Sequence, residues 1–194
     1  MDKTFQKLLQ TDIDLSSLGV ERRTDNEPYF CTPKGASVFG WTGVDGIHFC
    51  FVRGFGGMVF AVSPANTFPN YVHPLAKNFA DFLRLLLACG DVAALEQAWM
   101  WDKAQFETFL QDNPPTQEQQ ETLALVATKL KLMPMERPWA YIKELQASFA
   151  TVYKGNIIKN LIMDCQSYAK YRPNETTGGI FVSWRRKEEL PTGA

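Results

Sequence analysis

The sequence contains very little histidine. It has only two, His48 and His73, so any catalysis or metal binding that depends on imidazole has to use one or both of them. It also has no Gly-x-Ser-x-Gly nucleophile elbow and no His-Glu-x-x-His helix. Paired carboxylates are not evident either, because a turn explains Asp45 and helix starts explain Asp81, Asp91 and Asp102. These absences disfavour the hydrolases and metalloproteases that rely on such motifs.

An excess of either charge is also missing. Lysine and arginine together number 20, against 21 aspartates and glutamates, which gives a formal net charge of −1. Without a long basic face the chain cannot neutralise a phosphate backbone, so we expect no nucleic acid among its partners. The one dense basic cluster, at 185–187, is followed directly by Glu188 and Glu189, which favours a solvated segment.

Long apolar runs and closely spaced cysteines are likewise absent. No run approaches the roughly 20 apolar residues that span a bilayer, and the first residues lack the apolar core of a signal peptide. We therefore expect a cytoplasmic protein without membrane contact. The four cysteines, Cys31, Cys50, Cys89 and Cys165, lie far apart. Because this spacing fits neither a disulfide framework nor a zinc site, we expect reduced thiols and no cofactor.

The sequence does contain the material for a folded core. Apolar residues make up 45% and charged residues 21%, which is ordinary for a globular protein, and the length predicts one domain over residues 1–194. After a short helix at 2–10, aromatic and β-branched runs separated by glycine predict four strands. These are Pro28–Thr32, Ala36–Thr42, Gly46–Arg53 and Gly57–Val62. Glycines at 43, 46, 54, 56 and 57 suit tight hairpins, so consecutive strands should pair antiparallel.

The third of these strands predicts a sheet covered on both faces. Ile47, Phe49 and Phe51 alternate with His48, Cys50 and Val52, so each face of the strand carries bulky residues. Ser63–Pro74 contains three prolines and two asparagines, which indicates a loop with extended or short turn-like pieces.

Beyond this loop the apolar period becomes that of a helix. Asn78 can cap a helix that Gly90 ends, with Phe79, Phe82, Leu83 and Leu86 forming a stripe that we predict to be core. Further helices are predicted after Asp91, after the capping boxes Asp102/Gln105 and Thr116/Gln119, and around residues 139–149 and 158–169. Ile180–Trp184 is either a last strand or an extended arm.

Strands followed by helices indicate the α+β class, with an antiparallel or mixed sheet packed against several helices. We place the core at about residues 28–111 and a helical C-terminal extension at about 116–194.

The two histidines offer a weak case for chemistry. His48 and Cys50 share one face of a strand, which could juxtapose a thiol with a base or present two metal ligands. Their neighbours Phe49 and Phe51 favour core packing instead. His73 precedes the strongest helix, where it could orient a catalytic water, although anchoring of a backbone carbonyl is favoured.

Residues 54–57 resemble a phosphate-binding loop only in their glycines. Phosphate loops lead into a helix, whereas a strand follows here, so a hairpin is favoured. Its tip would present Arg53 and Phe55. With 5 tryptophans, 6 tyrosines and 14 phenylalanines, we do not expect every aromatic ring to be buried. We therefore predict partner contacts at Arg53, Phe55, Trp41 and Trp101.

Three segments together resemble one known family. Met58-Val59-Phe60-Ala61-Val62-Ser63-Pro64 is followed by Val72-His73-Pro74-Leu75-Ala76 and then by Asn78-Phe79-Ala80-Asp81-Phe82-Leu83-Arg84-Leu85-Leu86. Within about residues 36–111 this order resembles the SUKH superfamily, as a divergent member. That superfamily comprises glucan-synthesis-regulator-like proteins, many of them bacterial immunity proteins against toxins. The resemblance implies a bent sheet with helices, and a protein-binding, toxin-neutralising or regulatory role without a cofactor.

Three functions stay open at this point. The first is a non-enzymatic protein that binds and neutralises or regulates a protein partner. The second is a small hydrolase or metal-dependent enzyme that uses His48, Cys50 and His73. The third is a structural or oligomerising protein whose helices after Thr116 self-associate. The sequence is compatible with either a monomer or a homodimer.

Overall fold

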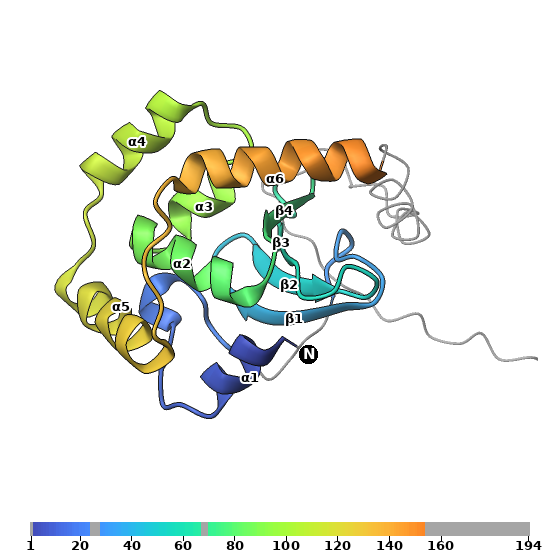
Figure 1. Cartoon of the computed structure of the whole chain (residues 1–194). Helices are drawn as coiled ribbons and strands as arrows, with labels where there is room; N and C mark the ends of the chain where they lie inside the picture. The colour runs from blue at the N-terminus through green and yellow to red at the C-terminus, as the bar shows by residue number, and fades with distance from the viewer. Residues whose placement is uncertain (1, 24–27, 67–69, 154–194) are drawn as a thin grey trace, which may run out of the picture.

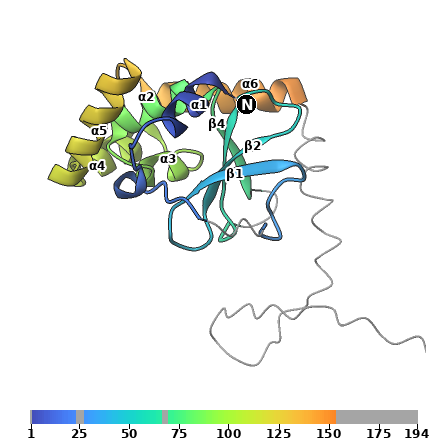
Figure 2. The same cartoon turned by 90° about the horizontal axis from the view of Figure 1, so that it is seen from below.

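The computed structural model describes residues 2–23, 28–66 and 70–153 of the chain. It is an α+β fold, which confirms the predicted class, with most of the helices gathered beside a four-stranded antiparallel sheet (Figures 1 and 2). The strands, in the spatial order β1-β2-β3-β4, are β1 (Ala36–Trp41), β2 (His48–Val52), β3 (Val59–Val62) and β4 (Val72–Ala76). The helices are α1 (Lys3–Leu9), η1 (Ser16–Leu18), α2 (Phe79–Cys89), α3 (Ala93–Gln97), α4 (Lys103–Asp112), α5 (Gln117–Leu130) and α6 (Pro138–Tyr153).

Tight turns join the first three strands. Gly43, Asp45 and Gly46 all have positive φ in the first turn, and Gly54 and Gly56 do so in the second. This backbone geometry is the one expected of short hairpins between antiparallel strands. The predicted meander is therefore confirmed for β1 to β3.

The predicted strand Pro28–Thr32 is wrong, because this segment forms a turn. The Thr32 amide donates to the Tyr29 carbonyl at 2.9 Å, and the Tyr29 amide donates to the Thr32 hydroxyl at 2.9 Å. A threonine side chain that satisfies a local amide offers the backbone an alternative to strand pairing.

The predicted loop Ser63–Pro74 is wrong at its end, where β4 begins. β4 is an edge strand, and Pro74 lies opposite Phe60 beside a register shift in β3. Proline lacks the amide that a central strand needs, but an edge strand beside a bulge tolerates it.

The inner face of the sheet packs against α2. Phe79, Phe82, Leu83 and Leu86 are completely buried there. Phe5 of α1 adds edge contacts to Phe51 and Phe79, with ring centroids 5.3 and 4.9 Å apart. Burial of this many large side chains is the main stabilising term of the fold.

The outer face of the sheet is apolar as well. Cys50, Val52, Phe60 and Val62 form a second buried cluster with Phe149 of α6. Both faces of β2 are therefore covered, as the alternating pattern of the sequence predicts. Helix α6 runs beside β4 (Figure 1), and the Gln146 amide group donates to the Pro74 carbonyl at 3.4 Å.

Helices α2, α4 and α5 begin at their predicted caps, whereas α3 begins after Val92, which makes no side-chain cap hydrogen bond, and not directly after Asp91. Asn78 accepts the Asp81 amide at 2.8 Å at the start of α2, and Gly90 ends that helix with φ of 91°. Full capping boxes open α4 at Asp102 and α5 at Thr116. The predicted helix at 158–169, the loop at 172–179 and the segment Ile180–Trp184 lie outside the described residues. Within the described ranges, no helix combines the length and apolar character needed to cross a bilayer.

Candidate functional site

His48 is held by hydrogen bonds on both ring nitrogens. Its Nδ1 lies 2.8 Å from the Gly46 carbonyl, which can only accept, so the neutral ring carries its proton on Nδ1. Nε2 then accepts from the Thr32 hydroxyl at 3.0 Å. Burial lowers the pKa of His48, which keeps the ring neutral. The residue ties the 28–32 turn to β2 and has no nitrogen left for a substrate.

Cys50 lies on the same face but is completely buried. Burial, and secondarily the neighbouring Cys31, raises the pKa of the Cys50 thiol to about 12. Because the thiolate is the nucleophile, a thiol with this pKa is inert at neutral pH.

His73 lies on the opposite face of the sheet from His48. In the ladder, His48 pairs with Val62 and His73 pairs with Ala61. Consecutive residues of β3 point to opposite faces, so the two imidazoles are separated by the sheet itself. The structure therefore does not bring His48, Cys50 and His73 together into one site.

The surroundings of His73 are those of a packed aromatic residue. Its ring stacks on Trp99, with centroids 4.5 Å apart and planes 9° apart, and Nε2 donates to the Asn70 carbonyl at 2.9 Å. Burial lowers the pKa of His73 to about 4. In the part of the chain that the structure describes, no three His, Cys, Asp or Glu side chains group as metal ligands.

Of the four predicted partner contacts, Trp41 is corrected by the structure. It is only 2% exposed, because Tyr29 of the 28–32 turn, His48 of β2 and the Arg23 guanidinium pack around it. Its ring lies 4.6 Å from His48 and 5.6 Å from Tyr29, and the Arg23 guanidinium lies 4.9 Å above it. Trp41 therefore belongs to the core and cannot anchor a partner in this conformation.

The two residues predicted at the hairpin tip, Arg53 and Phe55, differ in their exposure. Arg53 is exposed, as predicted for the tip. Phe55 instead turns back onto the outer face of the sheet, where its ring lies 5.4 Å from Phe60 and 5.6 Å from Phe149. Only Arg53 is thus freely presented to a partner at this turn.

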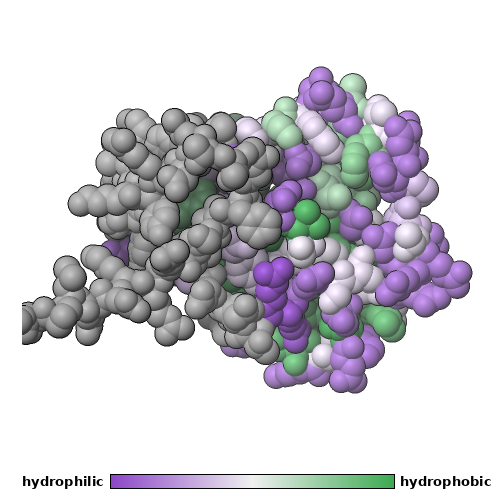
Figure 3. Space-filling model, turned by 180° about the vertical axis from the view of Figure 1, so that it is seen from behind, coloured by the Kyte–Doolittle hydropathy of each residue, from purple (hydrophilic) through white to green (hydrophobic). Residues whose placement is uncertain are grey.

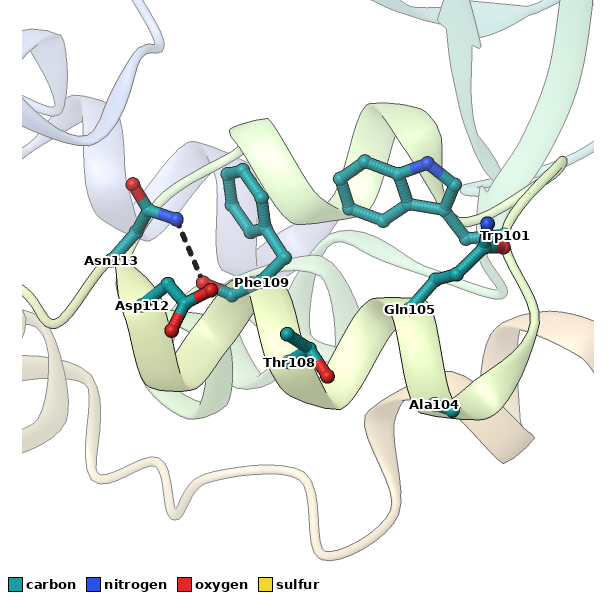
Figure 4. A pocket seen from close by; sticks show the side chains of 7 residues that line it. All are labelled: Trp101, Ala104, Gln105, Thr108, Phe109, Asp112 and Asn113. Atoms are coloured by element: carbon teal, nitrogen blue, oxygen red, sulfur yellow. Dashed lines mark hydrogen bonds between the residues drawn. The ribbon is translucent and has the colours of Figure 1, made fainter.

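The surface around Trp101 is the strongest candidate for a binding site among the described residues. Trp101 precedes the capping box of α4, and its ring centroid lies 5.0 Å from that of Phe109, two turns along the helix. The two rings lie on the same side of α4, with Gln105, Thr108 and Asp112 placed along the helix beside them (Figure 4). Together with Ala104 and Asn113 they line a shallow hollow of about 500 Å³ that is widely open to solvent.

Rigid local structure holds this hollow in shape. The Trp101 carbonyl accepts the indole N–H of Trp139 in α6 at 3.2 Å, and the Asn113 side-chain amide donates to the Phe109 carbonyl at 2.9 Å. We name the face formed by Trp101, Gln105, Thr108, Phe109 and Asp112 the α4 face.

The sequence identified only part of the α4 face. It singled out Trp101, but it gave no binding role to Phe109, Thr108 or Asp112. The helical spacing of 105, 108, 109 and 112 was the available signal, since these positions fall on one side of α4.

The rest of the visible surface offers weaker candidates for a binding site. Seen from behind, hydrophobic residues form small areas among hydrophilic ones (Figure 3). Searches with family models, among curated proteins and among solved structures find no match to this chain. The resemblance to the SUKH superfamily therefore stays a prediction, and a function has to be argued from the geometry of the chain itself.

Proposed function

We propose that this protein acts by binding another protein and not by catalysis, in an immunity-type or regulatory role. The observation that carries the proposal is the Trp101–Phe109 pair, which is partly exposed and opens onto a hollow of about 500 Å³. Tryptophan anchors that fit a pocket supply much of the free energy at protein interfaces.

The position of α4 supports this role. The helix lies at the periphery of the fold (Figure 1), and its capping box and the Trp139–Trp101 hydrogen bond keep its start in place. A binding face on a rigid helix loses little conformational entropy when a partner docks.

The enzyme alternative has less support. Both nitrogens of His48 are hydrogen-bonded, the Cys50 thiol is buried, and His73 lies across the sheet. Catalysis by these three residues would need a nucleophile and a base within hydrogen-bonding reach of each other.

The self-association alternative rests on three exposed apolar side chains after Thr116. Leu125 in α5 is 48% exposed, Met133 after that helix is 74% exposed, and Val152 in α6 is 69% exposed. Scattered apolar residues are common on monomers, so these three alone favour no interface. Light scattering of the full chain tests this alternative, since a dimer mass that falls to a monomer mass in a Leu125→Glu variant would support it.

Site-specific photocrosslinking tests the proposal directly. A benzoylphenylalanine placed at the exposed position Thr108, in the cells that make the protein, should give one adduct of defined mass. The same group at Thr128, exposed on α5, is the matched control and should not give that adduct. The captured protein, purified, should then bind the chain at a one-to-one ratio in titration calorimetry.

The stoichiometry separates binding from catalysis. A binding protein affects its partner only up to one equivalent, whereas an enzyme converts many equivalents. Covalent change of the captured protein by substoichiometric amounts of this chain would refute the proposal. Failure of both positions to crosslink any protein would also count against it.

A further inference from the structure

We propose that the α4 face takes a segment of the partner protein that carries an arginine or lysine next to an apolar side chain. This inference rests on the proposed function and adds the chemistry of the partner. The apolar side chain would cover the Trp101–Phe109 rings, and the cation would lie at Asp112 and the C-terminal end of α4.

The size of the hollow sets the first limit on the occupant. The hollow has a volume of about 500 Å³ but is shallow and widely open to solvent, so it offers contact to a few side chains of a partner without enclosing them. The ring pair supplies apolar surface. Beside it, the Thr108 hydroxyl and the Gln105 Nε2 can bond a backbone carbonyl, whereas the Gln105 Oε1 already accepts the Asp102 amide. A short segment with one apolar anchor fits this combination.

The charge at the end of α4 sets the second limit. The last carbonyls of a helix carry partial negative charge, so a cation is favoured in the last turn and a carboxylate is not. Asp112 occupies the last turn of α4, and that turn contains no basic residue. By contrast, α5 has Lys129 in its last turn. The C-terminal end of α4 therefore lacks the cation that would stabilise it.

The other charges of α4 do not neutralise this end. The helix and its cap contain three carboxylates, Asp102, Glu107 and Asp112, against one ammonium, Lys103. Lys103 lies 3.5 Å from Glu107, and Asp102 accepts the Gln105 amide in the capping box. The only ammonium of α4 is thus paired one turn into the helix, and Asp112 faces the hollow with its charge uncompensated on this helix.

Arginine and lysine satisfy both limits with one side chain. Their methylene groups pack along apolar surface while the charged end stays in water, and their cations bind favourably over aromatic rings. Arginine can also give two parallel hydrogen bonds to a carboxylate such as Asp112, which favours arginine over lysine.

Selection from a display library of random peptides of about twelve residues, on the full chain, tests the inference. We expect the enriched peptides to contain arginine or lysine adjacent to an apolar residue. Their dissociation constants are then measured by fluorescence anisotropy with labelled synthetic copies, including one in which citrulline replaces arginine. Citrulline keeps the shape and removes the charge, so it should weaken binding about threefold to tenfold.

Charge variants at one exposed position give the matched control. Thr108→Lys places a cation at the hollow and should weaken binding of the enriched peptides about tenfold, whereas Thr108→Glu should hold or tighten it. Asp112→Asn should weaken binding about threefold, and Arg53→Ala at the hairpin tip should leave it unchanged. All three positions are exposed, so folding of each variant should persist and is checked by circular dichroism.

Four results would overturn the inference. Three are peptides without a cation, peptides whose binding ignores both Thr108 variants, and no enrichment over an unrelated control protein. The fourth is loss of binding with Arg53→Ala, which would place peptide binding at the hairpin tip and not at the α4 face. The crosslinking experiment decides independently whether the chain binds a protein at all.

Discussion

Both ring nitrogens of His48 have partners, at the Gly46 carbonyl and the Thr32 hydroxyl. The imidazole of His48 therefore has a structural role, because it links the 28–32 turn to β2 by hydrogen bonds. The sequence favoured packing for this residue because of its phenylalanine neighbours. It could not reveal the partner, because Thr32 is 16 residues away and belongs to a segment that was predicted to be a strand.

Removal of the Thr32 hydroxyl measures how much its hydrogen bonds contribute to the stability of the fold. Thr32→Val leaves His48 Nε2 without a donor and the Tyr29 amide without an acceptor, so we expect the free energy of unfolding to fall by about 1–3 kcal/mol. Thr32→Ser keeps the hydroxyl and should cost clearly less. Urea denaturation compares the two variants. Equal losses would mean that the hydrogen bonds contribute nothing beyond packing.

The pKa of His73 predicts a loss of stability in mild acid. Its folded-state pKa is lowered by burial from 6.5 to about 4, so the unfolded chain binds the proton more readily. The contribution of His73 is therefore complete above pH 6.5 and is lost as the pH falls toward 4. We expect acidification from about pH 7.5 to about pH 5 to cost about 1–2 kcal/mol.

A His73→Phe variant isolates this contribution, because phenylalanine can still stack on Trp99 but cannot titrate. His48 shifts in the same direction, whereas Glu96, whose pKa burial raises, acts with the opposite sign. The difference between wild type and variant, measured by urea denaturation at both pH values, cancels these groups. An unchanged pH dependence in the variant would contradict the assignment to His73.

At the scale of elements, the helices followed their local signals closely. Asn78, Asp102 and Thr116 cap helices by bonds to residues three positions away, so the information is contained in a short window of sequence. The sequence did not predict β4 as a strand, because its formation does not depend on local signals. Its pairing with β3 is a property of the sheet edge, and local sequence around Pro74 indicates a loop.

The end of α2 allows a test that separates backbone strain from contact. Gly90 and Gly54 have nearly equal φ, 91° and 95°, but a Cβ at Gly90 would lie 2.7 Å from Pro115, whereas at Gly54 nothing lies within 4 Å. We expect Gly54→Ala to cost about 1 kcal/mol for the positive φ alone. Gly90→Ala should cost about 1–3 kcal/mol more, because Pro115 would have to move.

Thermal and urea denaturation of both glycine variants give the comparison. The larger loss at Gly90 should appear in both experiments. Equal losses would show that the loop before α5 yields at no cost, so that Pro115 does not restrain the end of α2.

At the scale of the whole molecule, the helices after Thr116 are part of the core. Val126 of α5 and Ile142 of α6 belong to the same buried cluster as Phe82. The sequence had separated a core at about 28–111 from a helical extension, and the packing joins α5 and α6 to that core. Helix α6 also reaches the outer face of the sheet through Phe149.

This arrangement predicts a single unfolding transition. Phe149→Ala removes a ring that lies 5.6 Å from both Phe55 and Phe60, so we expect a loss of about 3–5 kcal/mol. The transition midpoints from tryptophan fluorescence and from far-ultraviolet circular dichroism should fall together. Gln146→Ala, one turn earlier and half-buried, is a milder control. Two separated transitions would show instead that α6 and the sheet unfold independently.

The sequence by itself determined the α+β class, the caps of the long helices and the hairpin turns, because these depend on contacts between residues a few positions apart. Only the tertiary structure decided how reactive side chains from different strands lie relative to one another. It buried Trp41 and separated His73 from His48. It also set Trp101 beside Phe109 at the surface. These outcomes depend on which distant segments pack together. An aromatic side chain that no distant segment covers stays exposed and can contact a partner, whereas one that is covered becomes part of the core.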